Sequence, residues 1–174
     1  MNTIFSTISH HYFVSNAFKT NSDLLIRATI ELHKKVYKTL FPTTIKPHYL
    51  FDIRDLVSVF KGLILVAESK QIEDEIVPRL WYHEALRVYH DRLVTDEDSQ
   101  WLLSTLNETL SKYFNISIES PILFCDFLGS YQEVTDTIFV QTIVKNFLTE
   151  YNNSTSHDAV SMYIFSSTIE HIAR

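Results

Sequence analysis

Glycine is nearly absent from this sequence, since Gly62 and Gly129 are the only two glycines in 174 residues. Tight β-hairpins favour Asn-Gly or Asp-Gly turns, and neither dipeptide occurs. Loops that bind phosphates are also rich in glycine, because a Walker-type loop places spaced glycines before Lys-Ser or Lys-Thr. The sequence therefore argues against a hairpin-rich sheet. We also expect that this chain alone does not hydrolyse a nucleotide.

The apolar residues recur at helical spacing through most of the chain. We predict an all-α fold, a single helical domain of about six to seven helices that spans residues 1–174. The clearest helix is predicted over residues 53–67, after a cap at Asp52. Its predicted buried stripe contains Ile53, Leu56, Val57, Phe60, Leu63, Ile64 and Ala67.

Capping residues and prolines predict the helices of the N-terminal half. A short helix is expected over residues 2–12. A second helix is expected to begin at Ser22 and Asp23 and to end before Pro42. Residues 43–51 then form an extended link. The predicted inner face of the second helix consists of Leu25, Ala28, Leu32, Val36 and Leu40.

The C-terminal half is predicted in the same way. Pro78 suits the first turn of a helix that ends near Leu93, and Thr95 caps a helix that runs to Phe114. Residues 115–135 are expected to form an ordered loop. A helix follows over residues 136–151, and a last helix begins near residue 158. The last helix is expected to carry Met162, Phe165, Ile169 and Ile172.

Charge and composition disfavour several classes of function. The formal net charge is −6, and no run of Lys or Arg could follow a nucleic-acid backbone, so no nucleic-acid partner is expected. The N-terminus lacks the pattern of a signal peptide, and no long apolar stretch suits a membrane span. We therefore expect a soluble, cytoplasmic chain without a membrane partner. Cys125 is the only cysteine, which excludes an internal disulfide and favours a small core residue.

Arg54 is the candidate functional residue. A cation in the first turn of a helix lies at the positive end of the helix dipole, which is unfavourable unless an anion compensates. One explanation is an ion pair with Asp52 or Asp55. The other is that the planar guanidinium projects toward an external anion such as a nucleotide phosphate. Both explanations remain open from the spacing alone.

Residues 80–93, with the sequence LWYHEALRVYHDRL, combine aromatic and charged side chains. His83 and His90 lie too far apart along a helix to bind one ion directly, so no metal site is predicted. Glu84 and Arg87 are predicted to form an ion pair on the helix surface. We therefore expect a structural role for this stretch.

Several stretches together resemble the segment of dynein heavy chains that follows the third nucleotide-binding core. Residues 48–56 read HYLFDIRDL and are followed by Gly62, which is similar to the family pattern His-Tyr-x-Phe-Asn-Leu-Arg-Asp-Leu. Residues 80–93 resemble the family most strongly. Shorter similarities are found at residues 4–8 (IFSTI), 28–32 (ATIEL), 121–127 (PILFCDF), 150–152 (EYN) and 169–174 (IEHIAR).

This resemblance implies an AAA+ lid-type bundle with a C-terminal helical extension, as a fragment of a larger chain. Arg54 matches the sensor arginine that contacts the γ-phosphate of a nucleotide held by the adjacent large subdomain. Ile4 and Ile53 would then contact the nucleotide on its adenine side. The order Asp-Ile-Arg-Asp at residues 52–55 resembles axonemal more than cytoplasmic heavy chains. Asp52, Ser58 and Lys61 depart from the residues usual in the family.

The same resemblance implies a function within a minus-end-directed microtubule motor. The lid would close over ATP or ADP, with Mg, held elsewhere in the full-length motor, and would relay the conformational change. Cofactors are not expected in this chain itself, which would be part of an ATPase without being an enzyme in isolation. The implied partners are neighbouring AAA+ large subdomains and, through the whole motor, the microtubule and the dynein intermediate and light chains. The implied location is the cytoskeleton, in the axoneme of a cilium or flagellum.

A second interpretation is a free-standing helical scaffold or adaptor that binds partners through an exposed groove and has no nucleotide role. Helical periodicity fits both interpretations. A phosphate loop encoded shortly after Arg174 would favour the motor. A stop codon at that point, without flanking AAA+ cores, would favour the adaptor.

Overall fold

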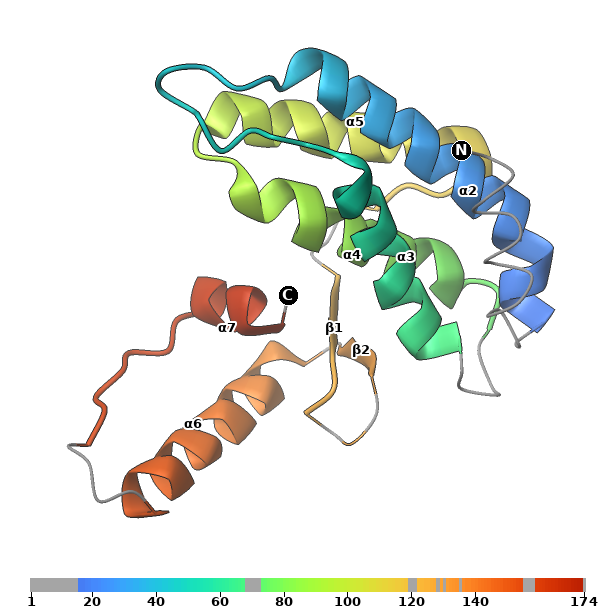
Figure 1. The fold of residues 1–174 in the computed structure, drawn as a ribbon. Helices are drawn as coiled ribbons and strands as arrows, with labels where there is room; N and C mark the ends of the chain where they lie inside the picture. Colours follow the sequence, from blue (N-terminus) through green and yellow to red (C-terminus); the bar gives the residue numbers. More distant parts are fainter. Residues whose placement is uncertain are drawn as a thin grey trace. The chain divides into compact units, whose positions relative to one another are not determined.

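The computed structural model describes residues 16–67, 73–118, 122–127, 129, 131–134, 136–154 and 159–173 (Figure 1). Six α-helices and one two-stranded sheet lie within these residues, in agreement with the predicted all-α class. The chain forms two compact units, residues 1–121 and residues 122–174. The prediction of a single domain stays a prediction, because one domain can contain two compact units. The short helix predicted over residues 2–12 lies outside the described residues.

The first described helix of the first unit is α2 (Asn16–Thr39). All five residues of its predicted inner face are buried, and the helix ends before Pro42 as predicted. The predicted cap at Ser22 and Asp23 is wrong, because both residues lie inside the helix. Phe18 and Ser22 are buried and continue the inner face toward the N-terminus. Burial of this extra turn therefore outweighs the preference of Ser and Asp for a helix start.

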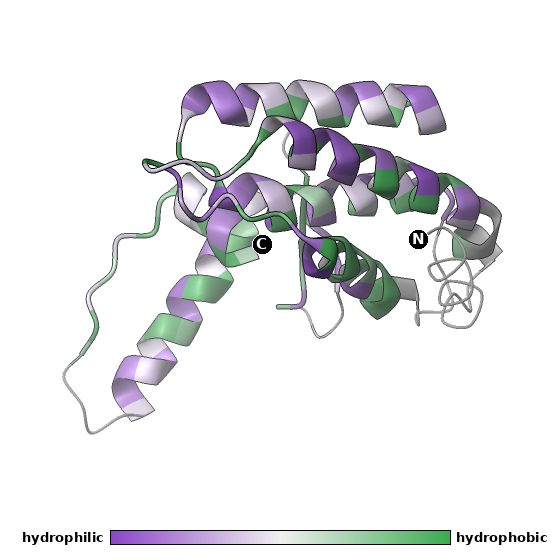
Figure 2. Cartoon of the chain, turned by 45° about the horizontal axis from the view of Figure 1, so that its top comes forward, coloured by the Kyte–Doolittle hydropathy of each residue, from purple (hydrophilic) through white to green (hydrophobic). Residues whose placement is uncertain are grey.

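Helix α3 (Ile53–Ala67) has the predicted bounds, but its buried face is partly different. Ile53 is 53% exposed, and Val57 and Ile64 are only partly buried. Arg54, Ser58 and Lys61 lie on one side of α3, and Figure 2 shows the remainder of the helix as largely hydrophobic. Periodicity therefore located the apolar face but did not determine which of its residues are buried. The buried hydrophobic residues are Leu56, Val59, Phe60, Leu63 and Val66.

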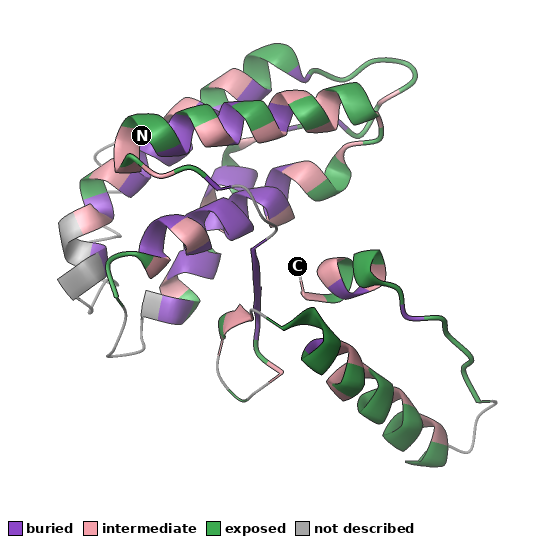
Figure 3. Ribbon diagram, turned by 180° about the vertical axis from the view of Figure 1, so that it is seen from behind, coloured by how far each residue is buried: buried purple, intermediate pink, exposed green. Residues whose placement is uncertain are grey.

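Helix α4 (Ile76–Tyr89) is the most buried helix of the first unit, as Figure 3 shows. It packs against α2, α3 and α5 (Asp96–Phe114). Pro78 lies in its first turn as predicted, and the short 3₁₀ helix η1 (His90–Arg92) extends it almost to the predicted end at Leu93. Thr95 precedes α5 in an extended conformation, which confirms the predicted N-cap position. Asn115 ends α5 in the left-handed conformation, with φ of 56°.

The second unit contains a small antiparallel hairpin, β1 (Leu123–Cys125) and β2 (Gln132–Val134). The prediction of an ordered loop over residues 115–135 is therefore wrong for these two strands. Leu123 pairs with Val134, and Cys125 pairs with Gln132. Gly129 lies between the strands with φ of +86°, a conformation that glycine adopts without strain. Strands of three residues are too short to produce a recognisable alternation in the sequence.

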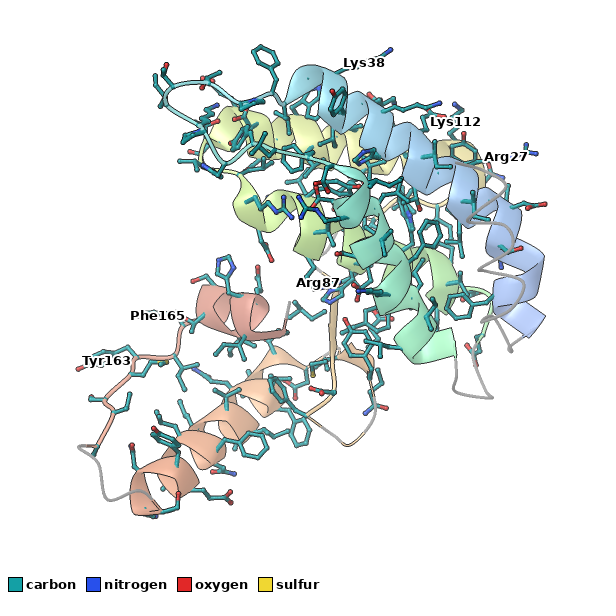
Figure 4. The ribbon with its side chains drawn as sticks, viewed as in Figure 1. Arg27, Lys38, Arg87, Lys112, Tyr163 and Phe165 are labelled. Atoms are coloured by element: carbon teal, nitrogen blue, oxygen red, sulfur yellow. The ribbon has the colours of Figure 1, made fainter. Side chains whose placement is uncertain are left out.

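Helices α6 (Thr137–Ser154) and α7 (Ser166–Ala173) complete the second unit. The Asp136 carboxylate accepts the backbone N–H groups of Ile138 and Phe139, so α6 begins as predicted. The last helix begins at Ser166, later than the prediction near residue 158. Figure 4 shows Tyr163 and Phe165 on the non-helical segment before α7, where they are 82% and 65% exposed.

The second unit has a small core of its own. This core is a cluster of the buried residues Cys125, Val140, Ile164 and Ile169. None of the helices in the described part of the chain is both long and apolar enough to span a membrane.

Candidate functional site

Two carboxylates determine the start of α3. Each accepts a backbone N–H group near the other one. The Asp52 Oδ1 atom accepts the backbone N–H of Arg54 at 2.7 Å, which satisfies a donor in the first turn. The Asp55 Oδ2 atom accepts the backbone N–H of Asp52 at 2.7 Å. This reciprocal arrangement resembles a capping box, except that the Asp52 side chain accepts from the second helical residue rather than the third. It explains why the helix begins immediately after Asp52.

Arg54 lies on the outer surface at this helix start, with a side chain that is 88% exposed. Its Nε and Nη2 atoms donate to Asp52 Oδ2 at 2.8 Å and 2.7 Å. The side-chain hydrogen bond between the two residues lowers the pKa of Asp52 and raises the pKa of Arg54. The structure therefore contains the ion pair that the spacing suggested, with Asp52 as its partner. Because a guanidinium has five N–H donors, the pair leaves donors of Arg54 facing solvent.

A surface hollow of about 580 Å³ adjoins Arg54. The end of α2 and the link before α3 form most of its wall. Aromatic and aliphatic side chains dominate the lining, and Arg54 and Asp52 provide its charged groups. This combination suits a ligand with a flat apolar part and an anionic part. The lining residues are Tyr37, Leu40, Phe41, Pro42, Tyr49, Leu50, Phe51, Asp52 and Arg54.

The link before α3 is held against the start of α5. The Tyr49 hydroxyl donates to Asp98 Oδ2 at 2.9 Å and accepts the backbone N–H of Val94 at 3.0 Å. Lys46 forms an ion pair with the same carboxylate. Burial alone would raise the pKa of Asp98, but hydrogen bonds from Lys46, Thr95 and Tyr49 hold that pKa below its ordinary value. The link is therefore a fixed wall of the hollow.

Arg92 connects the two longest sequence stretches that were singled out, residues 48–56 and 80–93. Its guanidinium forms an ion pair with Asp55 and donates to the carbonyl oxygen of Leu50 at 3.4 Å. It also lies over the Phe51 ring, 5.6 Å from the ring centroid. Sequence reasoning missed this role of Arg92. The available signal was that a cation and an acid lay in two separate stretches, but their pairing requires the tertiary fold.

Glu84 and Arg87 form an ion pair, but the predicted surface position is wrong for Glu84, which is 1% exposed. Arg87 donates to Glu84 through Nε at 2.8 Å and reaches the Ser58 carbonyl oxygen on α3 at 3.2 Å. A Cβ added at Gly62 would lie 1.9 Å from Glu84 Oε2. The glycine therefore provides the space for a buried carboxylate between α3 and α4. Figure 4 shows Arg87 beside α3 and, by contrast, Arg27 and Lys38 on the outer surface of α2.

The other residues singled out in the sequence are Ile53, Ile4 and Cys125. Ile53 is the residue before Arg54 and is largely exposed, whereas Ile4 lies outside the described residues. Cys125 is buried, as expected, and burial raises the pKa of its thiol. Such a thiol is a poor nucleophile at neutral pH. Within the described ranges, no group of three or more His, Cys, Asp or Glu side chains is placed to hold a metal ion.

Comparisons with known proteins identify similar sequences. The family model for the AAA+ lid domain matches residues 25–125. Dynein axonemal heavy chain 2 of Homo sapiens is 31% identical over 165 residues, which cover 90% of this chain and 4% of that protein. Dynein axonemal heavy chain 1 of Rattus norvegicus is 36% identical over 161 residues, which cover 86% of this chain and 4% of that protein. This chain therefore spans only a small part of the length of these relatives.

Proposed function

The chain belongs to the AAA+ lid domain family, and from this premise we propose that it is the helical lid of the third AAA+ module of a dynein heavy chain. The lid would close over a nucleotide held by the adjoining large subdomain. The similarity to axonemal dynein heavy chains over most of the chain supports the motor context. The third position in the motor rests on the resemblance of residues 48–56 and 80–93.

Arg54 is the proposed nucleotide sensor. The observation that carries this proposal is its exposed guanidinium at the first turn of α3, beside a hollow with an apolar wall. A guanidinium binds phosphate oxygens through parallel N–H donors. Ile53 would contact the adenine side, since it is exposed at the same helix start. Ile4 would contribute a second apolar contact.

The mechanism follows from differential binding. A phosphate that attracts Arg54 in one lid position and not in another shifts the equilibrium between the two positions. Because Arg54 is part of a continuous helix that packs on α4, its displacement would turn the helices of the first unit together. The neighbouring module would then move. Couplings of this kind typically change an affinity by about 5- to 150-fold.

The wider context of this proposal is the full-length motor. ATP or ADP, with Mg, would be bound by the large subdomains of the same heavy chain, which are the direct partners of the lid. The microtubule and the dynein intermediate and light chains would be partners of the whole motor. The axonemal names of the relatives favour a location in the cytoskeleton of a cilium or flagellum.

The substitution Arg54→Ala in the full-length motor tests the proposal. We expect weaker nucleotide-dependent gating of microtubule release by about 5-fold or more, because the lid loses its contact with the phosphate. Microtubule gliding and ATP-dependent release measure the effect. Arg27→Ala is the matched control, since Arg27 is also an exposed arginine but lies on α2. Unchanged gating and motility with Arg54→Ala would refute the sensor assignment.

A further inference from the structure

Arg92 contacts three different parts of the segment that leads into α3. Its Nη2 atom pairs with the Asp55 carboxylate, its Nη1 atom donates to the Leu50 carbonyl oxygen, and its planar guanidinium lies over the Phe51 ring. The backbone of the same residue takes part as well, because the carbonyl oxygen of Arg92 lies 3.1 Å from the Nε2 atom of His48. Arg92 therefore holds both the link and the first turn of the helix.

A short series of hydrogen bonds connects Arg92 to Arg54. Asp55, paired with Arg92 through Oδ1, uses Oδ2 to accept the backbone N–H of Asp52. Asp52 in turn accepts the backbone N–H and the side chain of Arg54. Asp55 is buried, and burial of a carboxylate is costly unless it is paired and hydrogen-bonded. These contacts connect Arg92, through Asp55 and Asp52, to the Arg54 guanidinium.

We propose that Arg92 is a positioning residue for Arg54, which fixes the helix start so that the Arg54 guanidinium points toward its anion. This inference rests on the proposed sensor function of Arg54. Arg92 is not itself expected to contact the nucleotide, because its guanidinium is already engaged by Asp55, Leu50 and Phe51. An exposed arginine loses much conformational freedom when it binds a phosphate. A residue that holds Arg54 in place beforehand reduces this entropic cost, even though it does not itself contact the phosphate.

Replacement of Arg92 by lysine separates positioning from simple stability. An ammonium can still neutralise the buried Asp55 carboxylate. The ammonium lacks the planar guanidinium of arginine. That guanidinium donates to Asp55 and to Leu50 at the same time and lies over the Phe51 ring. The fold is therefore retained while the start of α3 loosens. Arg87→Lys is the matched control, because Arg87 pairs with the buried Glu84 and contacts α3 at Ser58, away from the helix start.

The experiment compares Arg92→Lys, Arg87→Lys and Arg54→Ala in the full-length motor, with two measurements. Hydrogen exchange with mass spectrometry follows the backbone N–H groups of residues 48–56, and ATP-dependent microtubule release measures the nucleotide response. We expect faster exchange in this segment and a response about 2- to 30-fold weaker with Arg92→Lys. With Arg87→Lys, we expect both quantities to remain at the level of the unmodified motor.

Three outcomes distinguish this inference from the proposed function. If Arg54→Ala weakens the response and Arg92→Lys does not, the positioning role is wrong while the sensor role stands. If Arg87→Lys weakens the response as much as Arg92→Lys does, the effect is general destabilisation and the inference is also wrong. If Arg54→Ala has no effect, the sensor proposal fails. In that case, unchanged hydrogen exchange with Arg92→Lys would reject the positioning role as well. Faster exchange would show that Arg92 positions the backbone of residues 48–56, without an effect on nucleotide sensing.

Discussion

Gly62 shows how one residue without a side chain can set the packing of two helices. The carboxylate of Glu84 occupies the space that a Cβ at position 62 would fill. The same carboxylate is buried and held by Arg87, so it cannot move without separating an ion pair. Loss of the partner of a buried charge typically costs about 3 to 5 kcal/mol. The close approach of α3 and α4 therefore requires glycine at this position.

The substitution Gly62→Ala is expected to destabilise the fold by about 1 to 3 kcal/mol, because the added methyl group overpacks the interface. This expected loss is the net effect, after the gain of about 1 kcal/mol that alanine brings to a helix interior. Urea unfolding followed by circular dichroism measures the difference. Lys61→Ala is the control, since Lys61 is the exposed neighbour on the same helix. A Gly62→Ala protein as stable as the unmodified chain would contradict the packing described here.

At the scale of elements, the link between α2 and α3 owes its fixed path to one carboxylate. Asp98, in the first turn of α5, accepts hydrogen bonds from Tyr49 and Lys46 of the link and from Thr95. The pKa of Asp98 is lowered because these hydrogen bonds outweigh the effect of burial. Folding is therefore linked to the ionisation of this group.

Asp98→Asn is expected to reduce the loss of stability in acid. A carboxyl group whose pKa is lowered by folding contributes stability above its unfolded pKa of about 3.9, and this contribution is lost as the pH falls through the folded pKa. The free energy of unfolding, measured in urea between about pH 3 and pH 7, should therefore fall less steeply in the variant. Asp96→Asn changes the net charge equally at an exposed position of the same turn. Equal slopes for Asp98→Asn and the unmodified chain would show that Asp98 is not a source of this dependence.

At the scale of the whole molecule, each compact unit has its own buried residues. The first unit buries aromatic and aliphatic side chains from all four of its described α-helices, α2 to α5. Side-chain hydrogen bonds also join its helices: for example, Trp81 Nε1 donates to Thr29 Oγ1 at 2.8 Å, and the Tyr113 hydroxyl donates to Glu31 at 2.7 Å. The first unit therefore contains the interactions that a cooperative fold requires.

We expect residues 1–121 to fold without the remainder of the chain. Far-ultraviolet circular dichroism should show a helical spectrum, and thermal unfolding should be a single cooperative transition. A chain shortened to residues 1–94 is the control, because it lacks α5 and with it the fully buried Leu102, Leu106 and Leu110. That shorter chain should lose the transition. A non-cooperative response from residues 1–121 would mean that the first unit depends on residues 122–174 for its fold.

Local chemistry made several elements predictable from the sequence. Asp52 and Thr95 mark the starts of α3 and α5, and Asp136 marks the start of α6, because a capping side chain or an extended cap residue acts within one turn. The buried face of α2 was predictable since polar residues cover its other side. The exposure of Arg54 remained open, because an ion pair and an outward orientation have the same spacing in the sequence.

The tertiary structure decided the features that depend on distant residues. The apolar face of α3 is wider than its buried face, so the packing of α4 decided which of its residues are buried, and the burial of Glu84 on α4 required Gly62 on α3. The short strands β1 and β2 are defined by pairing with each other, which periodicity within one segment does not reveal. Arg92 meets Asp55 across 37 residues. The sequence by itself therefore determined where α3, α5 and α6 begin, since caps act locally. Only packing determined which faces meet and which charges become buried, since those depend on the contacts that neighbouring helices make in space.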